Sequence, residues 1–124
     1  MERTNFEKLQ VYQLSEKIAD SIWNIVITWN PFARDTVGKQ IVRAADSIGA
    51  NIAEGSGRGS LVDNRRFVRM ARGSLYEMLH WLRRCYMRKL LTQSEVKNLR
   101  TLVQELSPKL NAFLRSVDQR AKSR

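Results

Sequence analysis

Residues 45–60 read ADSIGANIAEGSGRGS, a run of small residues at helical spacing that ends in a glycine–serine segment. Ala45, Gly49 and Ala53 recur every four residues, so they lie on one helix face that a second helix can approach closely. Gly55 follows this face, and glycine is a common residue just past a helix end. The stretch therefore predicts a joint between two helices rather than an active site.

One acid in this stretch needs a compensating partner. Glu54 directly precedes the glycine that is expected to stop the helix. The C-terminal end of a helix carries partial negative charge, so an acid at this position is mildly unfavourable on its own. We therefore expect an arginine to pair with Glu54.

Apolar residues at alternating steps of three and four predict four helices and no strand. Pro31 separates the first two helices, because a proline biases the residue before it away from helical geometry. Long helices joined by short links pack as an antiparallel up-down four-helix bundle, so we predict a single all-α domain over residues 1–124. The expected helices cover about residues 7–29, 34–54, 61–89 and 93–119.

Capping residues mark the beginnings of the last two predicted helices. Ser60 or Asp63 is the expected N-cap of the third helix. Thr92 is the expected N-cap of the fourth, where Glu95 three residues later completes a capping box. Pro108 interrupts the apolar stripe of the fourth helix, so this helix either kinks there or gives way to a new one.

The bulk composition favours an anionic partner. The 124 residues include 22 Lys and Arg against 12 Asp and Glu, a formal net charge of +10. Nucleic acid is the first candidate and an anionic membrane the second, while a solvated basic surface without a dedicated partner is the alternative. No apolar run approaches the ~20 residues that span a bilayer, and no signal-peptide pattern opens the sequence, so we expect a cytoplasmic protein with no membrane partner.

Residue types that support catalysis are scarce. Cys85 is the only cysteine and lies in an apolar stretch, which predicts a buried and inert thiol in a reducing compartment. His80 is the only histidine, so no histidine-based metal cluster is available and no nucleophile motif accompanies it. The glycine-rich residues 55–59 follow a helix rather than a strand and lack the lysine of a phosphate-binding loop. We therefore expect no enzyme activity and no catalytic, metal or cofactor site.

The positive charge is organised on the third predicted helix. Arginines spaced i, i+4 and i+7 begin a line along one face, and a tyrosine, a histidine and a further arginine continue it. Guanidinium groups bind phosphates in a forked geometry and aromatic rings stack on exposed bases, so we predict an RNA or DNA surface. A solvated face, whose arginines pair with Asp63, Glu77 or Glu54, is the alternative. The predicted binding residues are Arg65, Arg69, Arg72, Tyr76, His80, Arg83, Arg84 and Arg88.

The first predicted helix carries more apolar surface than one core stripe requires. Trp23, Val26 and Ile27 lie off its main seam. A bundle core uses about three positions in seven, so the surplus indicates contacts with other subunits. We predict a homo-oligomer, with a thicker core and some exposed aromatic residues as the alternative.

Several segments together resemble a known family. They are NFEKLQVYQLSEKIAD (5–20), VGKQIVRAADSIGANIAEGSGR (37–58) and RRFVRMARGSLYEMLHWL (65–82). Their order is similar to that in the four-helix bundle proteins encoded in 23S ribosomal RNA intervening sequences. The accessory variability determinant of diversity-generating retroelements shares this fold, and residues 78–99 also look like that relative.

The resemblance to this family also implies a particular assembly and a protein partner that the residues alone do not indicate. It implies a left-handed antiparallel bundle that assembles as a ring-shaped homopentamer. In the retroelement relative it implies a basic protein that binds nucleic acid and a reverse transcriptase. The net charge of +10 favours this accessory-protein interpretation.

The family motif also maps onto one polar line of the second predicted helix, at steps of three, four, four and three. Polar groups beside an apolar seam commonly fix register or partner choice through hydrogen bonds. We expect Glu54 to pair with Arg43 or Arg72, while a line that faces a ligand or RNA is the alternative. The line consists of Gln40, Arg43, Ser47, Asn51 and Glu54.

Two functional interpretations therefore remain. The first is a non-enzymatic, basic, oligomeric nucleic-acid-binding accessory protein that partners a reverse transcriptase in a diversity-generating retroelement. The second is an intervening-sequence-encoded structural or protein-interaction module that does not bind nucleic acid. Steeply salt-dependent RNA or DNA binding separates the two.

Overall fold

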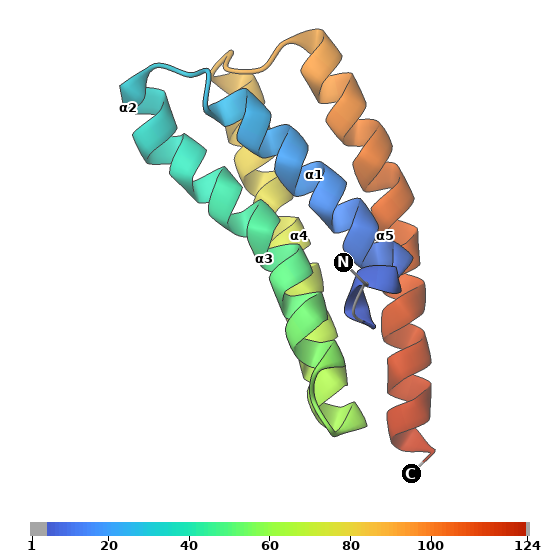
Figure 1. Ribbon diagram of the computed structural model, residues 1–124. Helices are drawn as coiled ribbons and strands as arrows, with labels where there is room; N and C mark the ends of the chain where they lie inside the picture. Colours follow the sequence, from blue (N-terminus) through green and yellow to red (C-terminus); the bar gives the residue numbers. More distant parts are fainter. Residues whose placement is uncertain (1–4, 124) are drawn as a thin grey trace.

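The computed structural model describes residues 5–123 (Figure 1). Within this range the chain is helical and contains no strand, which confirms the all-α four-helix bundle. The pentameric ring stays a prediction. The elements are η1 (Phe6–Lys8), α1 (Gln10–Val26), α2 (Pro31–Ala33), η2 (Arg34–Gly38), α3 (Lys39–Ser56), α4 (Leu61–Met87) and α5 (Gln93–Lys122).

The four long helices run alternately up and down (Figure 1). Helix α3 packs against α1 on one side and α4 on the other, and α5 packs against α4 and α1. Each helix therefore has two principal neighbours, and the bundle closes through the contact between α1 and α5. Within residues 5–123 no helix is both long enough and apolar enough to cross a membrane.

One continuous apolar core fills the bundle, and each of the four long helices contributes residues to it. Ile18, Ile48 and Leu106 are completely buried, and Leu75 is 1% exposed. Val26 also belongs to this core at 5% exposure, so its predicted place off the main seam is wrong. Trp23 and Ile27 do lie outside the core, which fills the space between the helices without them.

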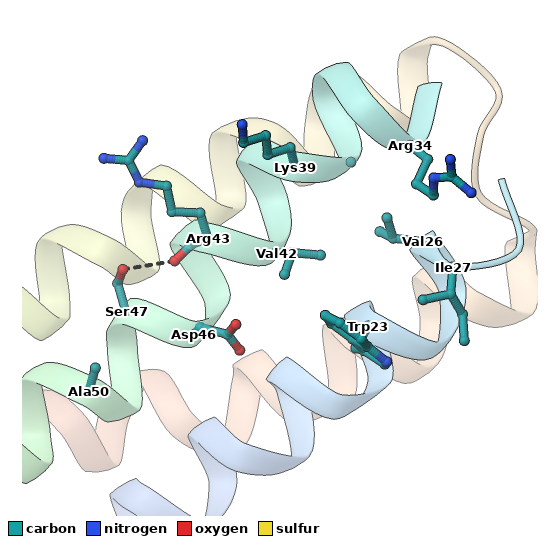
Figure 2. A pocket seen from close by; sticks show the side chains of 11 residues that line it. Trp23, Val26, Ile27, Arg34, Lys39, Val42, Arg43, Asp46, Ser47 and Ala50 are labelled. Carbon is teal, nitrogen blue, oxygen red and sulfur yellow. Dashed lines mark hydrogen bonds between the residues drawn. The ribbon is translucent and has the colours of Figure 1, made fainter. Parts of the chain in front are cut away.

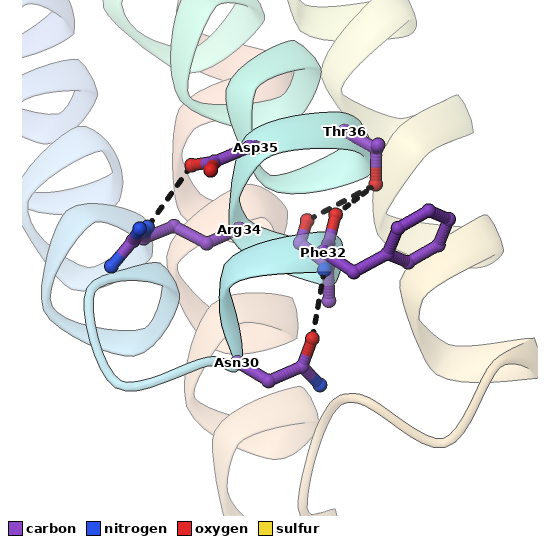
Figure 3. Close-up of polar contacts among 6 residues, drawn as sticks. Asn30, Phe32, Arg34, Asp35 and Thr36 are labelled. Carbon is purple, nitrogen blue, oxygen red and sulfur yellow. Dashed lines mark hydrogen bonds and ion pairs between the residues drawn. The ribbon is translucent and has the colours of Figure 1, made fainter.

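The first connection differs from its expected boundaries. Helix α1 ends at Val26, three residues before the predicted end, and the next helix begins at Pro31 rather than near residue 34. Asn30 is extended, and its side-chain oxygen accepts a hydrogen bond from the Ala33 amide at 3.0 Å (Figure 3). The proline at the first helical position needs no hydrogen-bond donor, so Asn30 and Pro31 together start the helix earlier than the apolar pattern shows.

The stretch at residues 45–60 is a joint, as predicted, but one of its glycines acts differently from the prediction. A Cβ on Gly49 would lie 2.9 Å from the Ser15 hydroxyl oxygen, which confirms that a small residue lets α1 approach α3. Gly55 does not stop α3, because the helix continues to Ser56 with Gly57 as its C-cap. A Cβ on Gly55 would lie 2.8 Å from the Asn64 side-chain oxygen. Gly55 therefore allows close packing of α3 on α4.

The helix ends follow the predicted capping chemistry. The Ser60 hydroxyl accepts from the Asp63 amide at 3.0 Å, so Ser60, not Asp63, is the N-cap of α4. Thr92 and Glu95 form the reciprocal capping box at the start of α5. Helix α5 then continues through Pro108 to Lys122, so the alternative in which a new helix starts at Pro108 is wrong.

Candidate nucleic-acid interface

The predicted line of basic and aromatic residues runs along the surface of α4. Arg69, Tyr76, His80 and Arg83 are exposed along it, and the Tyr76 side chain reaches 58% exposure. Arg65 and Arg72 are half-buried members of the same line. Aromatic rings thus lie between arginines on an accessible helix face, which is the arrangement the sequence predicted.

Two of the predicted binding residues lie elsewhere on α4. At roughly 100° per residue, Arg84 and Arg88 are turned by about 100° or more from the line that starts at Arg65. Arg88 is moreover the C-cap of α4, where the helical geometry ends. The structure therefore brings six of the eight predicted residues onto one face and leaves these two off it.

Two arginines of the line converge on one carboxylate of α5. Arg65 Nε lies 3.6 Å and an Arg69 terminal nitrogen 3.3 Å from Oδ1 of Asp118. One negative charge cannot neutralise two positive ones, so this cluster keeps a net positive charge. Asp118 was not predicted, because its position opposite Arg65 depends on how α4 and α5 pack.

The predicted acidic partners on α4 neutralise little of the line. Asp63 pairs with Arg66, whose guanidinium also lies over the Phe67 ring at 4.7 Å. Glu77 accepts a hydrogen bond from the Trp81 indole at 3.2 Å. Across residues 5–123 no ion pair engages the remaining arginines of the predicted set. They are Arg72, Arg83, Arg84 and Arg88.

His80 is an exposed residue whose ring meets the edge of the neighbouring Trp81 ring, with the ring centres 4.7 Å apart. Cys85 is buried, as predicted. Burial raises the pKa of its thiol to about 11, and the nearby positive charge of Arg88 offsets this only in part. The thiol is therefore protonated at neutral pH and is a poor nucleophile. Among the described residues no group of three His, Cys, Asp or Glu side chains could hold a metal ion.

The polar line of α3 is mostly satisfied within its own helix. The Ser47 hydroxyl donates to the Arg43 carbonyl at 2.8 Å, and the Asn51 amide donates to the Ser47 carbonyl at 2.9 Å. Only Asn51 reaches another helix, at 3.5 Å from the Ser74 hydroxyl of α4. Gln40 is half-buried at the start of the line.

The predicted partner of Glu54 is wrong. Its carboxylate pairs with Arg58 at 2.7 Å rather than with Arg43 or Arg72. Arg58 lies four residues after Glu54, just beyond the Gly57 C-cap of α3 and within reach of the Glu54 side chain. The four-residue spacing of Glu54 and Arg58 is visible in the sequence and is the pattern that predicts this pair.

A separate cavity of about 580 Å³ lies between α1 and α3 (Figure 2). Trp23, Ile27 and Val42 form its apolar part, and Lys39 and Asp46 are among the charged residues around it. Trp23 and Ile27 are 55% and 52% exposed. Burial raises the pKa of the Asp46 carboxyl, and the nearby acid Asp20 raises it further.

Comparison with known proteins places the chain in a family. The pattern of the 23S rRNA-intervening sequence proteins matches residues 7–112. The chain belongs to this family. The match covers all four bundle helices except the last part of α5, so the family identity extends over nearly the whole fold.

The family's fold recurs in a solved structure. This is a protein with unknown function from the S23 ribosomal protein family of Bacteroides thetaiotaomicron. It is 24% identical, with a TM-score of 0.74 over 84% of this chain and 97% of that one. Similarity at this identity shows the fold alone. A comparison with curated proteins finds no match.

Proposed function

We propose that this member of the 23S rRNA-intervening sequence protein family is a non-enzymatic accessory protein that binds nucleic acid through α4. The observation that supports the proposal most directly is the line of basic and aromatic residues on this helix. Arg72 and Arg83 in this line have no acidic partner within residues 5–123. Their guanidinium groups are free to donate hydrogen bonds to phosphate oxygens.

The charge distribution agrees with this choice of face. Residues 61–89 contain eight Lys and Arg against two Asp and Glu, whereas residues 10–26 contain one Lys against two acids. A polyanion is therefore attracted to the side of the bundle that α4 forms, and this attraction also raises the association rate. Each phosphate that a basic residue neutralises releases counterions, so binding should weaken steeply with salt.

The finer part of the proposal concerns assembly and partners. We propose that the protein acts as a homo-oligomer, with a ring-shaped pentamer as the form implied by the family resemblance. The same resemblance supports a reverse transcriptase of a diversity-generating retroelement as its protein partner. An oligomer would repeat the α4 line on every subunit, so several phosphate-binding faces would act on one strand and increase the total affinity.

Neutralising Arg72 and Arg83 together to Gln tests the proposed face. Arg65 and Arg69 are less suitable, because both pair with Asp118 and their replacement would also leave that carboxylate without its partners. We expect the affinity for an RNA oligonucleotide to fall about tenfold or more, since charge-assisted hydrogen bonds are lost. The slope of log affinity against log salt should become shallower by about 0.7 for each lost phosphate contact on a single strand. Fluorescence anisotropy across a salt series measures both quantities.

The matched control removes the same charge from two other helices. Lys17 and Lys39 are exposed on α1 and α3, and their joint replacement by Gln also lowers the net charge by two. If this control weakens binding as much as the α4 variant does, net charge rather than the α4 line drives binding. The absence of RNA and DNA binding by the unchanged protein at physiological salt would contradict the proposal.

The second candidate function is a structural or protein-interaction module. The observation in its favour is the exposed apolar surface of Trp23 and Ile27 beside the cavity between α1 and α3. Exposed apolar surface of this kind is typical of protein–protein contacts. A stable oligomer that binds no nucleic acid would support this candidate over the first.

A further inference from the structure

A second groove lies at the seam between α4 and α5. Its volume is about 360 Å³. Aliphatic side chains from both helices form its floor, among them Leu79 and Leu82 of α4 and Val96 and Val103 of α5. A cavity of this volume falls in the lower part of the range of ~300–1,000 Å³ that is typical of small-molecule sites.

The walls of this groove carry positive charge only. Arg83 from α4 and Arg100 from α5 line it, both side chains are exposed, and no acidic residue lines it. Neither arginine forms an ion pair within the described part of the chain. The cavity between α1 and α3 is different, because the carboxylate of Asp46 lines it together with its basic residues.

The groove also contains an aromatic ring and two amides. Tyr86 lines it and is 46% exposed, so part of its ring is available for stacking. Gln93 and Gln104 line the groove as well, and a glutamine amide can both donate and accept hydrogen bonds. These groups match the parts of a nucleotide. The apolar floor and the aromatic ring suit the base, the amides suit the ribose, and the two arginines suit the phosphates.

We infer that the α4–α5 groove holds one unpaired base of a single-stranded RNA, with Tyr86 stacked on the base and Arg83 and Arg100 bound to the neighbouring phosphates. This inference rests on the proposed function, because Arg83 is also the last residue of the α4 line. A strand that follows the line past Tyr76 and His80 reaches the groove at Arg83. The line supplies affinity for phosphates and the groove supplies the preference for an unpaired base.

Physical reasons favour a single strand and RNA. A base in a duplex is covered on both faces by its neighbours, so it cannot enter the groove without the cost of unstacking. RNA presents unpaired bases in loops, bulges and ends, and aromatic side chains recognise them there. The ribose 2′-hydroxyl distinguishes RNA from DNA, and with the arginines bound to phosphates the amides of Gln93 and Gln104 are available to bond to it.

The test compares an unstructured oligoribonucleotide with the same strand annealed to its complement. Tyr86→Ala removes the stacking ring, and Tyr86→Phe is the matched control that keeps it. We expect Tyr86→Ala to weaken binding of the single strand about tenfold, because stacking of one base contributes on this scale. Duplex binding should stay unchanged, and Tyr86→Phe should bind both forms like the unchanged protein. Fluorescence anisotropy gives the six affinities of the three proteins for the two RNA forms.

The outcomes separate this inference from the proposed function. If the unchanged protein binds neither RNA nor DNA, both fail. If it binds RNA but Tyr86→Ala weakens single strand and duplex equally, or weakens neither, only the groove assignment fails. An equal loss on a deoxyribonucleotide of the same sequence would overturn the assignment to RNA.

A second measurement locates the strand directly and does not depend on a folded variant. An oligoribonucleotide with 4-thiouridine is crosslinked to the unchanged protein by light, and the attached peptide is identified by mass spectrometry. We expect the crosslink within residues 79–104, which contain every residue that lines the groove. Crosslinks confined to α1 or α3 would overturn the inference. For the Tyr86→Ala variant, a change of oligomer mass without a change in RNA affinity would overturn it as well.

Discussion

Two glycines of the long helices face different surroundings. Gly55 is buried, and a Cβ there would lie 2.8 Å from the Asn64 side-chain oxygen and 3.0 Å from the Phe67 Cβ. Gly73 lies on the exposed side of α4, where a Cβ would meet nothing within 4 Å. The first glycine is required by close helix packing, whereas the second only raises the conformational entropy of the unfolded chain.

Replacing each glycine by alanine should therefore change stability in opposite directions. Gly55→Ala should lower the free energy of unfolding by about 1–3 kcal/mol, because neighbouring atoms of α4 must move to admit the methyl group. Gly73→Ala should raise it by about 0.5–1 kcal/mol, because alanine is the better helix former. Urea denaturation followed by circular dichroism measures both values. A Gly55→Ala variant as stable as the unchanged protein would contradict the close packing.

Residues whose environment depends on tertiary packing were the ones that the sequence predicted least well. The expected partners of Glu54 were Arg43 and Arg72, whereas the carboxylate pairs with Arg58, and packing against α4 keeps Gly55 helical. Asp118 lies far along the chain from Arg65 and Arg69, and no local pattern links them. The line on α4 was predicted from spacing alone, since helical periodicity places such residues on one face.

The start of α5 depends on a capping box in which each partner satisfies the other's backbone. The Thr92 hydroxyl accepts from the Glu95 amide at 3.1 Å, and the Glu95 carboxylate accepts from the Thr92 amide at 2.8 Å. These bonds satisfy two backbone donors that the helix itself leaves without a partner. The capping box thus fixes where α5 begins after the short loop from α4.

Thr92→Ala should therefore lower the free energy of unfolding by about 1 kcal/mol. Thr101→Ala is the matched control, because the Thr101 hydroxyl is exposed within α5 and bonds only to the Lys97 carbonyl of its own helix. We expect the control to stay within about 0.5 kcal/mol of the unchanged protein. Thermal and urea unfolding of both variants checks this. Equal effects of the two substitutions would show that the cap contributes nothing specific.

Element boundaries were predictable where capping chemistry is local and less so elsewhere. The beginnings of α4 and α5 follow from Ser60 and Thr92, whose side chains bond to amides three residues ahead. The end of α1 was placed three residues too late, because the apolar stripe continues to Trp29 after the helix has ended. The Trp29 side chain packs against the core although the residue lies in the connection after α1. Periodicity alone does not distinguish an apolar residue inside a helix from one in such a connection.

Exposed apolar side chains support the proposed association of subunits. Ile27 and Val62 are exposed to nearly the same extent, at 52% and 56%. Ile27 lines the cavity between α1 and α3, whereas Val62 lies in the first turn of α4. The pair therefore allows the proposed oligomer contact to be tested against a matched apolar residue at another place.

Ile27→Gln should shift the oligomer toward smaller species, because the lost apolar surface contributed to the contact between subunits. Val62→Gln should leave the assembly unchanged. Native mass spectrometry and sedimentation at several protein concentrations measure the distribution, and a pentamer is the expected form of the unchanged protein. A monomer at every concentration, or equal effects of the two substitutions, would contradict the proposed oligomer contact.

The closed arrangement of the four long helices has a consequence for how the chain folds. Three of its four seams join helices that follow one another in the sequence, α1 with α3, α3 with α4 and α4 with α5. Contacts between consecutive segments form quickly because little chain must be closed into a loop. The seam between α1 and α5 is the exception, since it brings together the first and last long helices. We therefore expect the contact between α1 and α5, which closes the longest loop, to form last.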